Sequence, residues 1–331
     1  MTDWAQVADH GIPTLPGVLD PMVLGKHLEF FSSAPWRWGK LSDVRIQVLR
    51  CHSGRRCIFE IALRTAAGVR TLIGKVYALD NSEVFHAMQR ISSAGFGAEQ
   101  EFSIPQPVAY LRELRLLLQE KVPGRPAREI FLTGNESERV MAAERCAKWL
   151  ARFHATAPKI GPVFDPSDHL LWLEQCSRSV AASGDPLSRK MVRVLHCLKH
   201  TASQLTPVET CASHGDFSPA QVILSDGRTA TCDWDSCGVA DPDRDAGRFL
   251  AGLERLGLRK LGSIRMLDVA AEVFLKTYIG LGGQGRELHL RFYKAANHLK
   301  SIRRKMVKPD WRERIEVTLD ECLRTLTGCL A

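Results

Sequence analysis

The residues best suited to chemistry lie between Ser213 and Asp235, a segment that combines Ser-His-Gly-Asp, a short apolar run and Thr-Cys-Asp-Trp-Asp. Within it, Asp216 precedes Gln221 by five residues and Asp233 follows Gln221 by twelve. Asp216 could orient a hydroxyl group, while amide and carboxylate oxygens are the hard ligands that Mg²⁺ prefers. Phosphoryl transfer requires a metal ion, a positioned hydroxyl and a base, so the segment indicates this chemistry.

A β-hairpin is predicted to bring these groups together. Residues 222–224 are an apolar run typical of a buried strand, Asp226-Gly227 favours a tight turn, and residues 229–232 form the returning strand. A hairpin of this length returns Asp233 to the end of the sheet at which Gln221 lies. Asp216 is then expected in the loop that leads into the hairpin.

The segment resembles the catalytic segment of the aminoglycoside phosphotransferase and choline kinase family, which is related to the protein kinases. That family has His-Gly-Asp, four residues, Asn, a hairpin, and then Asp-x-Asp or Asp-x-Glu. The resemblance implies that Asp216 is catalytic and that Gln221, Asp233 and Asp235 hold Mg²⁺. Gln221 stands where the family usually has Asn, with the same carbonyl oxygen on a side chain that is one methylene longer.

Three alternative interpretations stay open. The aspartates could be turn and cap residues of an ordinary hairpin. The chain could be a catalytically idle, kinase-like binding module, for which Gln221 is the only argument. A net charge of +8 and a pI of about 9.0 raise a third, a nucleic-acid-binding protein. Because no zinc-ligand spacing, RNP-like stretch or basic-aromatic interleaving supports it, nucleic acid is not the expected partner.

The pattern from Asp43 onward predicts three antiparallel strands near residues 44–49, 58–63 and 71–77, since apolar residues recur with period two. Lys75 lies on the third strand among apolar neighbours, and a partly buried lysine requires an anion. In the family that the chain resembles, this lysine binds the nucleotide phosphates and pairs with a helix glutamate. Glu83, on a helix predicted near residues 81–92, is the candidate partner, with Glu99 and Glu101 as alternatives. The resemblance also implies that Gly54, in the turn between the first two strands, lies over the ATP phosphates, where a missing side chain lets backbone N–H groups approach.

Residues 104–108 lead into a predicted fourth strand, and a fifth is predicted near residues 114–119, followed by Glu120-Lys-Val-Pro-Gly124. The resemblance implies that this segment is the hinge, with backbone groups of Glu120 and Val122 paired with adenine. After it, apolar residues recur at three- and four-residue spacing, which is typical of helices.

We therefore expect a two-lobed, protein-kinase-like α+β fold. A small antiparallel-sheet lobe would span residues 1–120, with residues 1–40 as an extension packed on it, and a mostly helical catalytic and acceptor-binding lobe would span residues 121–331.

Three further features have structural interpretations. Asp245 begins a predicted helix, and in the family that the chain resembles an aspartate at this place fixes the catalytic loop. His154 lies on a helical apolar face, which favours a packed core histidine over a catalytic one. Gly280-Leu-Gly-Gly-Gln-Gly285 matches the dinucleotide-binding pattern, but it follows a predicted helix rather than a strand, so we predict an interhelix loop.

Composition limits the setting of the protein. Ten cysteines without a paired framework or C-x-x-C spacing predict reduced thiols in a cytoplasmic protein. The chain has no run of eighteen apolar residues and no secretory signal pattern, so no membrane partner is expected. The predicted ligands are ATP with Mg²⁺ and a small molecule that supplies a hydroxyl group.

The C-terminal charge balance bears on that acceptor. Between residues 286 and 314, only three acidic residues, Glu287, Asp310 and Glu313, oppose ten basic ones. A pocket that binds polycations is expected to be lined with carboxylates instead. We therefore expect a neutral or anionic acceptor, such as a sugar-like metabolite, although a solvated helix face would carry the same charges. The basic residues are Arg286, Arg291, Lys294, Lys300, Arg303, Arg304, Lys305, Lys308, Arg312 and Arg314.

Overall fold

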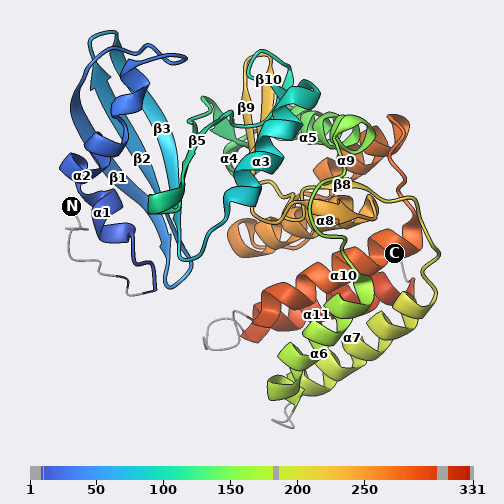
Figure 1. Ribbon diagram of the computed structural model, residues 1–331. Helices are drawn as coiled ribbons and strands as arrows, with labels where there is room; N and C mark the ends of the chain where they lie inside the picture. Colours follow the sequence, from blue (N-terminus) through green and yellow to red (C-terminus); the bar gives the residue numbers. More distant parts are fainter. Residues whose placement is uncertain (1–8, 10, 182–185, 304–311, 329–331) are drawn as a thin grey trace. The chain divides into compact units, whose positions relative to one another are not determined.

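The computed structural model describes residues 9, 11–181, 186–303 and 312–328. The chain divides into two compact units, Met1–Pro123 and Gly124–Ala331, and the division falls three residues after the boundary predicted at residue 120. The first unit is built on an antiparallel sheet and the second is mostly helical (Figure 1). This is the α+β class that the sequence predicted.

The sheet of the first unit has the strand order β1-β2-β3-β6-β5, and all neighbouring strands are antiparallel. The predicted strands and the helix after the third strand are all present. The elements of this sheet and its connections are β1 (Leu41–His52), β2 (Arg56–Thr65), β3 (Gly68–Tyr77), α3 (Ser82–Ile91), η3 (Ser92–Phe96), β4 (Phe102–Ser103), β5 (Pro107–Leu111), η4 (Arg112–Leu114) and β6 (Leu116–Glu120).

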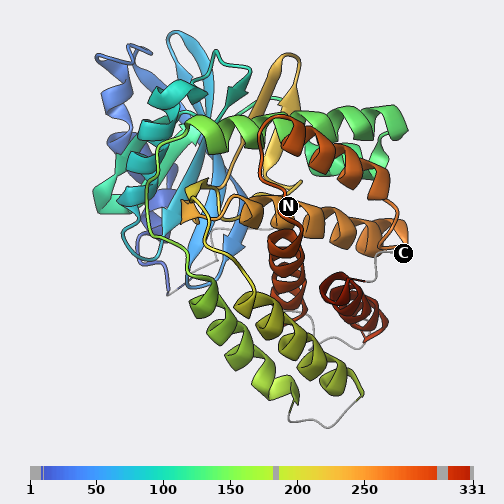
Figure 2. The same cartoon turned by 90° about the vertical axis from the view of Figure 1, so that its right-hand side faces the viewer.

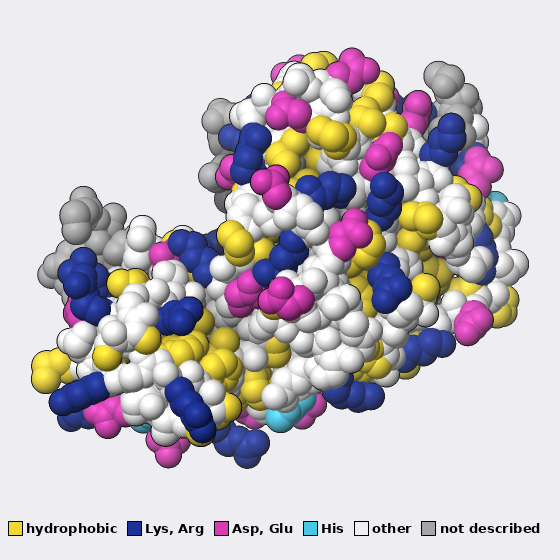
Figure 3. Space-filling model, turned by 90° about the horizontal axis from the view of Figure 1, so that it is seen from above, with side chains coloured by type: hydrophobic (Ala, Val, Ile, Leu, Met, Phe, Trp, Pro, Cys, Tyr) yellow, Lys and Arg dark blue, Asp and Glu magenta, His cyan; other side chains and the backbone are white. Residues whose placement is uncertain are grey.

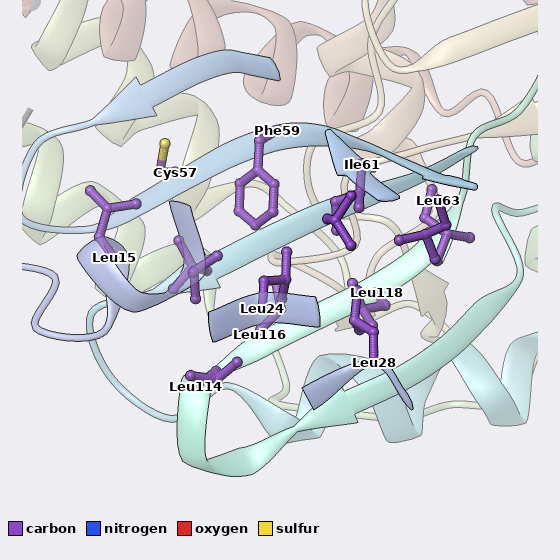
Figure 4. Packing of buried hydrophobic residues seen from close by; sticks show 14 of the residues in the cluster. Leu15, Leu24, Leu28, Cys57, Phe59, Ile61, Leu63, Leu114, Leu116 and Leu118 are labelled. Atoms are coloured by element: carbon purple, nitrogen blue, oxygen red, sulfur yellow. The ribbon is translucent and has the colours of Figure 1, made fainter. Parts of the chain in front are cut away.

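The described part of the N-terminal extension covers one face of this sheet. It forms α1 (Leu15–Leu19), α2 (Pro21–His27) and η2 (Glu29–Ser32). Leu15 and Leu24 from these helices share one buried cluster with Phe59 and Leu118 from the strands (Figure 4). Since successive strand residues point to opposite faces, Lys75 lies on the face that these helices do not cover.

The prediction that all cysteines are reduced was wrong for two of them. The register of β1 and β2 places Cys51 opposite Cys57, with their Cα atoms 4.1 Å apart, and the two form a disulfide. Sequence spacing could not predict this bond, because only the hairpin register brings the two thiols face to face. The cysteines that the structure describes as free are Cys146, Cys197, Cys211, Cys232, Cys237 and Cys322.

The second unit contains two small sheets among its helices. In one of them β9 pairs with β7 and with β10, and in the other β8 pairs with β11. The strands are β7 (Arg125–Pro126), β8 (Cys211–Ser213), β9 (Val222–Ser225), β10 (Arg228–Thr231) and β11 (Gly238–Ala240). The β9–β10 hairpin is the one that the sequence predicted, and Gly227 in its turn has φ +69°, which suits glycine.

Helices make up the rest of this unit. One group, α6, α7, α10 and α11, packs around a shared apolar cluster that includes Leu198, Phe292 and Leu319 (Figure 2). The loop at residues 281–286 joins α9 to α10, which confirms the predicted interhelix loop. In the described residues, no helix has the length and apolar character that a bilayer span requires. The helical elements are α4 (Ala127–Thr133), α5 (Glu136–Thr156), α6 (Pro166–Ala181), α7 (Pro186–Ser203), α8 (Asp243–Leu256), η5 (Gly257–Leu261), α9 (Asp268–Gly280), α10 (Glu287–Arg303) and α11 (Arg312–Thr327).

Candidate active site

The loop that carries Asp216 follows β8 and is anchored by aromatic packing. Asp216 is half-buried, whereas the adjacent Phe217 is fully buried. The Phe217 ring stacks on Trp149 of α5, with ring centroids 5.6 Å apart, and on Phe249 of α8, with centroids 5.3 Å apart. Since such ring pairs stabilise beyond simple burial, they fix the loop on both helices.

His214 is fully buried and joins this loop to the end of the hairpin. Its Nδ1 accepts a hydrogen bond from the N–H of Asp216 at 3.2 Å, and its Nε2 lies 2.9 Å from the carbonyl oxygen of Cys232. Because a backbone N–H donates and a carbonyl accepts, these partners require the neutral tautomer with its proton on Nε2. Burial lowers the pKa of His214, which favours the neutral form. His214 is therefore a positioning residue that holds the Asp216 backbone near Asp233.

Gly215 lets the loop approach the segment that follows the hairpin. Its φ of +74° lies in the left-handed region, where glycine has no steric cost. A Cβ at this position would lie 2.0 Å from the carbonyl oxygen of Ser236. Only glycine therefore fits between His214 and Asp216.

Asp245, at the start of α8, holds the loop that carries Asp216 through hydrogen bonds. This confirms the prediction that Asp245 fixes the catalytic loop. Its carboxylate accepts the N–H groups of His214 at 2.7 Å and Gly215 at 2.9 Å. His154 contacts the same carboxylate at 3.4 Å and the Tyr278 hydroxyl at 2.8 Å, so it belongs to this packed network. Burial, the largest influence, raises the pKa of Asp245, but the His154 hydrogen bond and the nearby positive groups outweigh it and lower the pKa to about 2.

Arg248 contacts Asp216, the candidate catalytic residue. The sequence motifs did not indicate a role for Arg248. Its Nη2 forms an ion pair with Asp216 Oδ1, and its Nη1 donates a hydrogen bond to Asn297 Oδ1 at 2.8 Å. Both side chains of the ion pair are mostly buried. The only local signal was spacing: Arg248 lies three residues after Asp245, so both project from one face of α8. Arg248 thus fixes the orientation of the Asp216 carboxylate and leaves Oδ2 for other contacts.

Gln221 lies between two carboxylates. Its side-chain Nε2 is 3.3 Å from Asp216 Oδ2 and 3.4 Å from Asp233 Oδ2. Its main-chain carbonyl oxygen accepts the N–H of Cys232 at 2.7 Å across the base of the hairpin. A half-turn of the amide exchanges Nε2 for Oε1 and places three oxygens around one small space. Hard oxygens of this kind are the donors that Mg²⁺ requires, so the residues present fit that ion.

The two acids after the hairpin occupy a constrained segment. Asp233 has φ +70°, a left-handed conformation that aspartate adopts more readily than most side chains. Such conformations persist where the surrounding structure imposes them, and they concentrate at functional sites. Trp234, between the two acids, is buried and donates its Nε1–H to the carbonyl oxygen of Thr231 at 2.9 Å. Asp233 and Asp235, which flank Trp234 in the chain, are both half-buried.

Lys75 and Glu83, which the sequence assigned to the nucleotide phosphates, belong to the first unit. Lys75 is only 4% exposed on β3, with Ile58 and Leu117 opposite it on the neighbouring strands. Glu83 is exposed in the first turn of α3, and among the described residues it forms no ion pair. The apolar residues that the helix buries are Val84, Ala87, Met88 and Ile91, whereas Glu83 is exposed, so the predicted Lys75–Glu83 pair does not form in this structure.

The other predicted nucleotide contacts lie at the two ends of that sheet. The N–H of Gly54 donates to Asp9 Oδ2 at 2.8 Å, so a carboxylate of the N-terminal segment occupies the place where a phosphate contact was predicted. Glu120 is the last residue of β6, and its Oε2 accepts the N–H of Gln106 at 3.1 Å. Val122 is buried just before the division between the units.

A second cluster of titratable side chains lies around the start of α8. Asp241, Asp243 and His289 are all buried and close together. Asp241 Oδ2 lies 2.5 Å from His289 Nδ1, while Asp243 accepts the N–H groups of Gly285 at 2.9 Å and Arg286 at 3.1 Å. Burial, with the Asp241 charge second, raises the pKa of Asp243 to about 6. Since these carboxylates already have protein partners, we interpret the cluster as a structural tie between α8 and the α9–α10 loop.

A model of the phosphotransferase enzyme family matches residues 60–273, well over half of the chain. The chain belongs to this family. It is therefore a phosphotransferase, and the matched range includes Lys75, Asp216, Gln221 and Asp233. Phosphotransferases of this kind act on hydroxyl groups and use ATP with a divalent cation such as Mg²⁺. A search of curated protein sequences found no match.

Solved structures with the same fold cover almost the whole phosphotransferase. A choline/ethanolamine kinase family protein from Mesorhizobium loti is 14% identical, with a TM-score of 0.58 and coverage of 92% of this chain and 94% of that one. A thermostable mutant of an aminoglycoside phosphotransferase, in complex with ADP and hygromycin B, is 15% identical, with a TM-score of 0.60 and coverage of 92% and 99%. An amicoumacin kinase in complex with AMP-PNP and Ca²⁺ is 15% identical, with a TM-score of 0.61 and coverage of 93% of both chains. At these identities the similarity establishes the fold alone.

Substitutions of Gln221 test its assignment as a metal ligand. We expect Gln221→Asn to keep activity, since it retains an amide oxygen. Gln221→Ala should raise the Mg²⁺ concentration that gives half-maximal turnover by about 10-fold or more, which corresponds to a lost contact worth about 1.4 kcal/mol. The measurement is ADP release across a Mg²⁺ titration. Identical titration curves for Gln221→Ala and the wild type would remove Gln221 from the metal site.

Proposed function

We propose that this phosphotransferase transfers the γ-phosphoryl group of ATP to a hydroxyl group of a neutral or anionic small molecule. One observation carries the proposal: the carboxylate of Asp216 forms an ion pair with Arg248 and lies beside the amide of Gln221. Asp216 would orient the acceptor hydroxyl and accept its proton. Arg248 would keep the carboxylate in place, because phosphoryl transfer depends mainly on positioning and charge stabilisation.

Gln221 and Asp233, assisted by Asp235, would hold Mg²⁺ next to this base. Mg²⁺ bound there would neutralise the negative charge on the phosphoryl oxygens. The hairpin and the His214 bridge support this assignment, since both hold Asp233 in a fixed relation to Asp216. The protein contributes a rigid set of oxygen donors, and rigid donors lose little entropy when they bind an ion.

The nucleotide contacts of the first unit remain proposals. Lys75 would bind the phosphates. Gly54 would contact phosphate through its N–H once Asp9 is displaced. The backbones of Glu120 and Val122 would pair with adenine. The position of Lys75 on β3, where the residue is only 4% exposed, supports its role, because a charge-assisted contact with phosphate is strong in a site that excludes water.

The C-terminal charge count is a weaker guide to the acceptor than the sequence suggested. Arg304, Lys305 and Lys308 lie outside the described residues. Within them, Lys294 is paired with Glu254 at 2.6 Å, and Arg291 is paired with Glu287. On the face shown in Figure 3, basic and acidic side chains are also interspersed. The neutral or anionic acceptor is instead supported by the surroundings of Arg244, considered below.

The proposed function is tested by a screen for acceptor-dependent ADP release from ATP and Mg²⁺. Neutral, amino and acidic hydroxyl compounds are compared, and the mass of each product is measured. The expected result is a product heavier by one phosphoryl group, formed only when Asp216 is intact. Nucleotide binding without turnover on any compound, and without Asp216-dependent ATP hydrolysis, would reject the proposed function.

Lys75→Ala should weaken the use of ATP more than the use of the acceptor. A charge-assisted contact to phosphate is worth about 1.5–3 kcal/mol, so we expect the nucleotide KM to rise by at least about 10-fold. Lys75→Met keeps the apolar stem without the charge and should behave in the same way, which separates charge from packing. Lys26→Ala, at an exposed position on α2, is the control. Unchanged KM and kcat in both Lys75 variants would place the lysine outside the nucleotide site.

A further inference from the structure

A cavity of about 330 Å³ lies within the second unit, and the residues just after the predicted metal ligands in the chain form part of its wall. Its wall includes residues 236–238, which directly follow Asp235, together with residues 162–165 and the start of α6. The segment at 162–165 runs beside β11, because Phe164 donates its N–H to the Val239 carbonyl oxygen at 2.8 Å and Val239 donates to Pro162 at 2.9 Å. The volume is at the lower end of the range for small-molecule sites, so the cavity suits a small metabolite.

Arg244 supplies a cationic group to the wall of this cavity. Its guanidinium lies over the ring of Phe164, 3.9 Å from the centroid, and its Nη1 donates to Ser213 Oγ at 3.1 Å. Within the described residues Arg244 forms no ion pair, although it is half-buried. A guanidinium has five N–H donors in a planar fork, and a hydroxyl and a ring face use only part of them. The arrangement leaves a cation that is pre-oriented for an anionic group.

The position of Arg244 connects this cation to the reacting centre. Arg244 and Arg248 are four residues apart on α8, so they project from the same face of the helix, roughly 6 Å apart along its axis. Arg248 contacts Asp216, and Ser213, the partner of Arg244, lies three residues before Asp216. A small acceptor could therefore present its hydroxyl to Asp216 and an anionic group to Arg244.

The other groups around the cavity are compatible with such a ligand. His169 and Trp172 stack with ring centroids 5.7 Å apart and form an aromatic wall. Burial, followed by the charges of Lys300, Arg244 and Arg248, lowers the pKa of His169 to about 4, so the ring is neutral at pH 7. Asp165 and Asp168 also line the cavity, but both are exposed, where water screens their charge, and Asp165 accepts the N–H of Ser167 at 2.7 Å.

We propose that Arg244 is a specificity-determining residue that binds an anionic group of the acceptor, so that the acceptor is a small hydroxylated carboxylic acid or phosphate monoester. This inference rests on the proposed function, because it takes the cavity beside Asp235 as the acceptor site. Either anion matches the planar fork of a guanidinium, which can bind two oxygens at once.

The test uses acceptors that share a carbon skeleton and differ in charge. Glucose, glucosamine, glucuronate and glucose 6-phosphate form one series, and glycerol, glycerate and glycerol 3-phosphate form another. Initial rates of ADP release are measured with the full-length wild type, Arg244→Gln, Arg244→Lys and Arg193→Gln, the last an exposed arginine on α7 as control. Thermal unfolding of each variant shows whether it is folded.

In the wild type, kcat/KM is expected to be higher for an acid than for its neutral and amino counterparts. Arg244→Gln should reduce the ratio of kcat/KM for the acid to that for its neutral counterpart by about 10–100-fold, chiefly through KM, and Arg244→Lys should restore part of it. If the ratio falls for the carboxylate, the anion that Arg244 binds is a carboxylate; if it falls for the phosphate ester, the anion is a phosphate. Arg193→Gln should leave the ratio unchanged.

Three outcomes would overturn the inference alone. The first is a preference of the wild type for neutral or amino acceptors. The second is an equal loss for all acceptors in a folded Arg244→Gln, and the third is Asp216-dependent ATP hydrolysis that none of the acids stimulates. A complete lack of Asp216-dependent ADP release would instead reject the proposed function, and this inference with it.

Discussion

Asp216→Asn is expected to reduce turnover by about 10²–10⁴-fold, the contribution typical of a positioned general base. Asparagine keeps an oxygen that can accept the hydrogen bond from Arg248, so the loop should keep its conformation. It has neither the negative charge nor the capacity to take a proton from the acceptor. The aromatic anchor at Phe217 is untouched, and we therefore expect a thermal unfolding temperature close to that of the wild type.

The measurement is kcat for ADP release with the best acceptor from the screen, together with a thermal melt. Asp226→Asn is the matched control, because Asp226 is exposed in the turn of the same hairpin and should leave turnover unchanged. Near-normal kcat in a verified, folded Asp216→Asn variant would exclude Asp216 from the mechanism.

Asp245→Ala is expected to produce the largest loss of stability. The substitution leaves the buried N–H groups of His214 and Gly215 without their acceptor, and each such group costs about 1–3 kcal/mol. We therefore expect the free energy of unfolding to fall by about 2–6 kcal/mol, measured by denaturant titration. Turnover should fall as well, since the loop that presents Asp216 loses its anchor. Glu272→Ala, an exposed carboxylate on α9, is the control, and a loss no greater than in that variant would contradict the assigned role.

The same residue predicts a dependence of stability on pH. The folded-state pKa of Asp245 is about 2, below the ordinary value near 3.8. A lowered folded-state pKa means that the stabilising contribution is complete above about pH 4 and is lost as the pH falls toward 2. Between these values the stability of the wild type should fall more steeply than that of Asp245→Ala. Parallel stability curves for the two proteins would show that Asp245 is not the group responsible.

Much of the fold followed from local sequence. The period-two pattern of residues 44–77 and the Asp226-Gly227 turn each depend on neighbours a few positions apart, so the strands and the hairpin could be predicted. The spacing of Asp216, Gln221 and Asp233 also determined that these groups would meet, because hairpin length and side-chain period together place both ends at one edge. For the same reason the chemistry of the site could be inferred before its geometry was known.

Only the tertiary structure decided which side chains hold and surround that site. The ion pair of Arg248 with Asp216 joins residues 32 positions apart, and the Arg244 cavity combines segments that begin at 162, 236 and 244. The Glu83 prediction also depended on tertiary packing, since the rotation of α3 on the sheet, which no local period specifies, left it exposed. Contacts of this kind depend on how α8 packs against the catalytic loop and on which face each helix buries. These are properties of the assembled core, and a short stretch of sequence does not contain them.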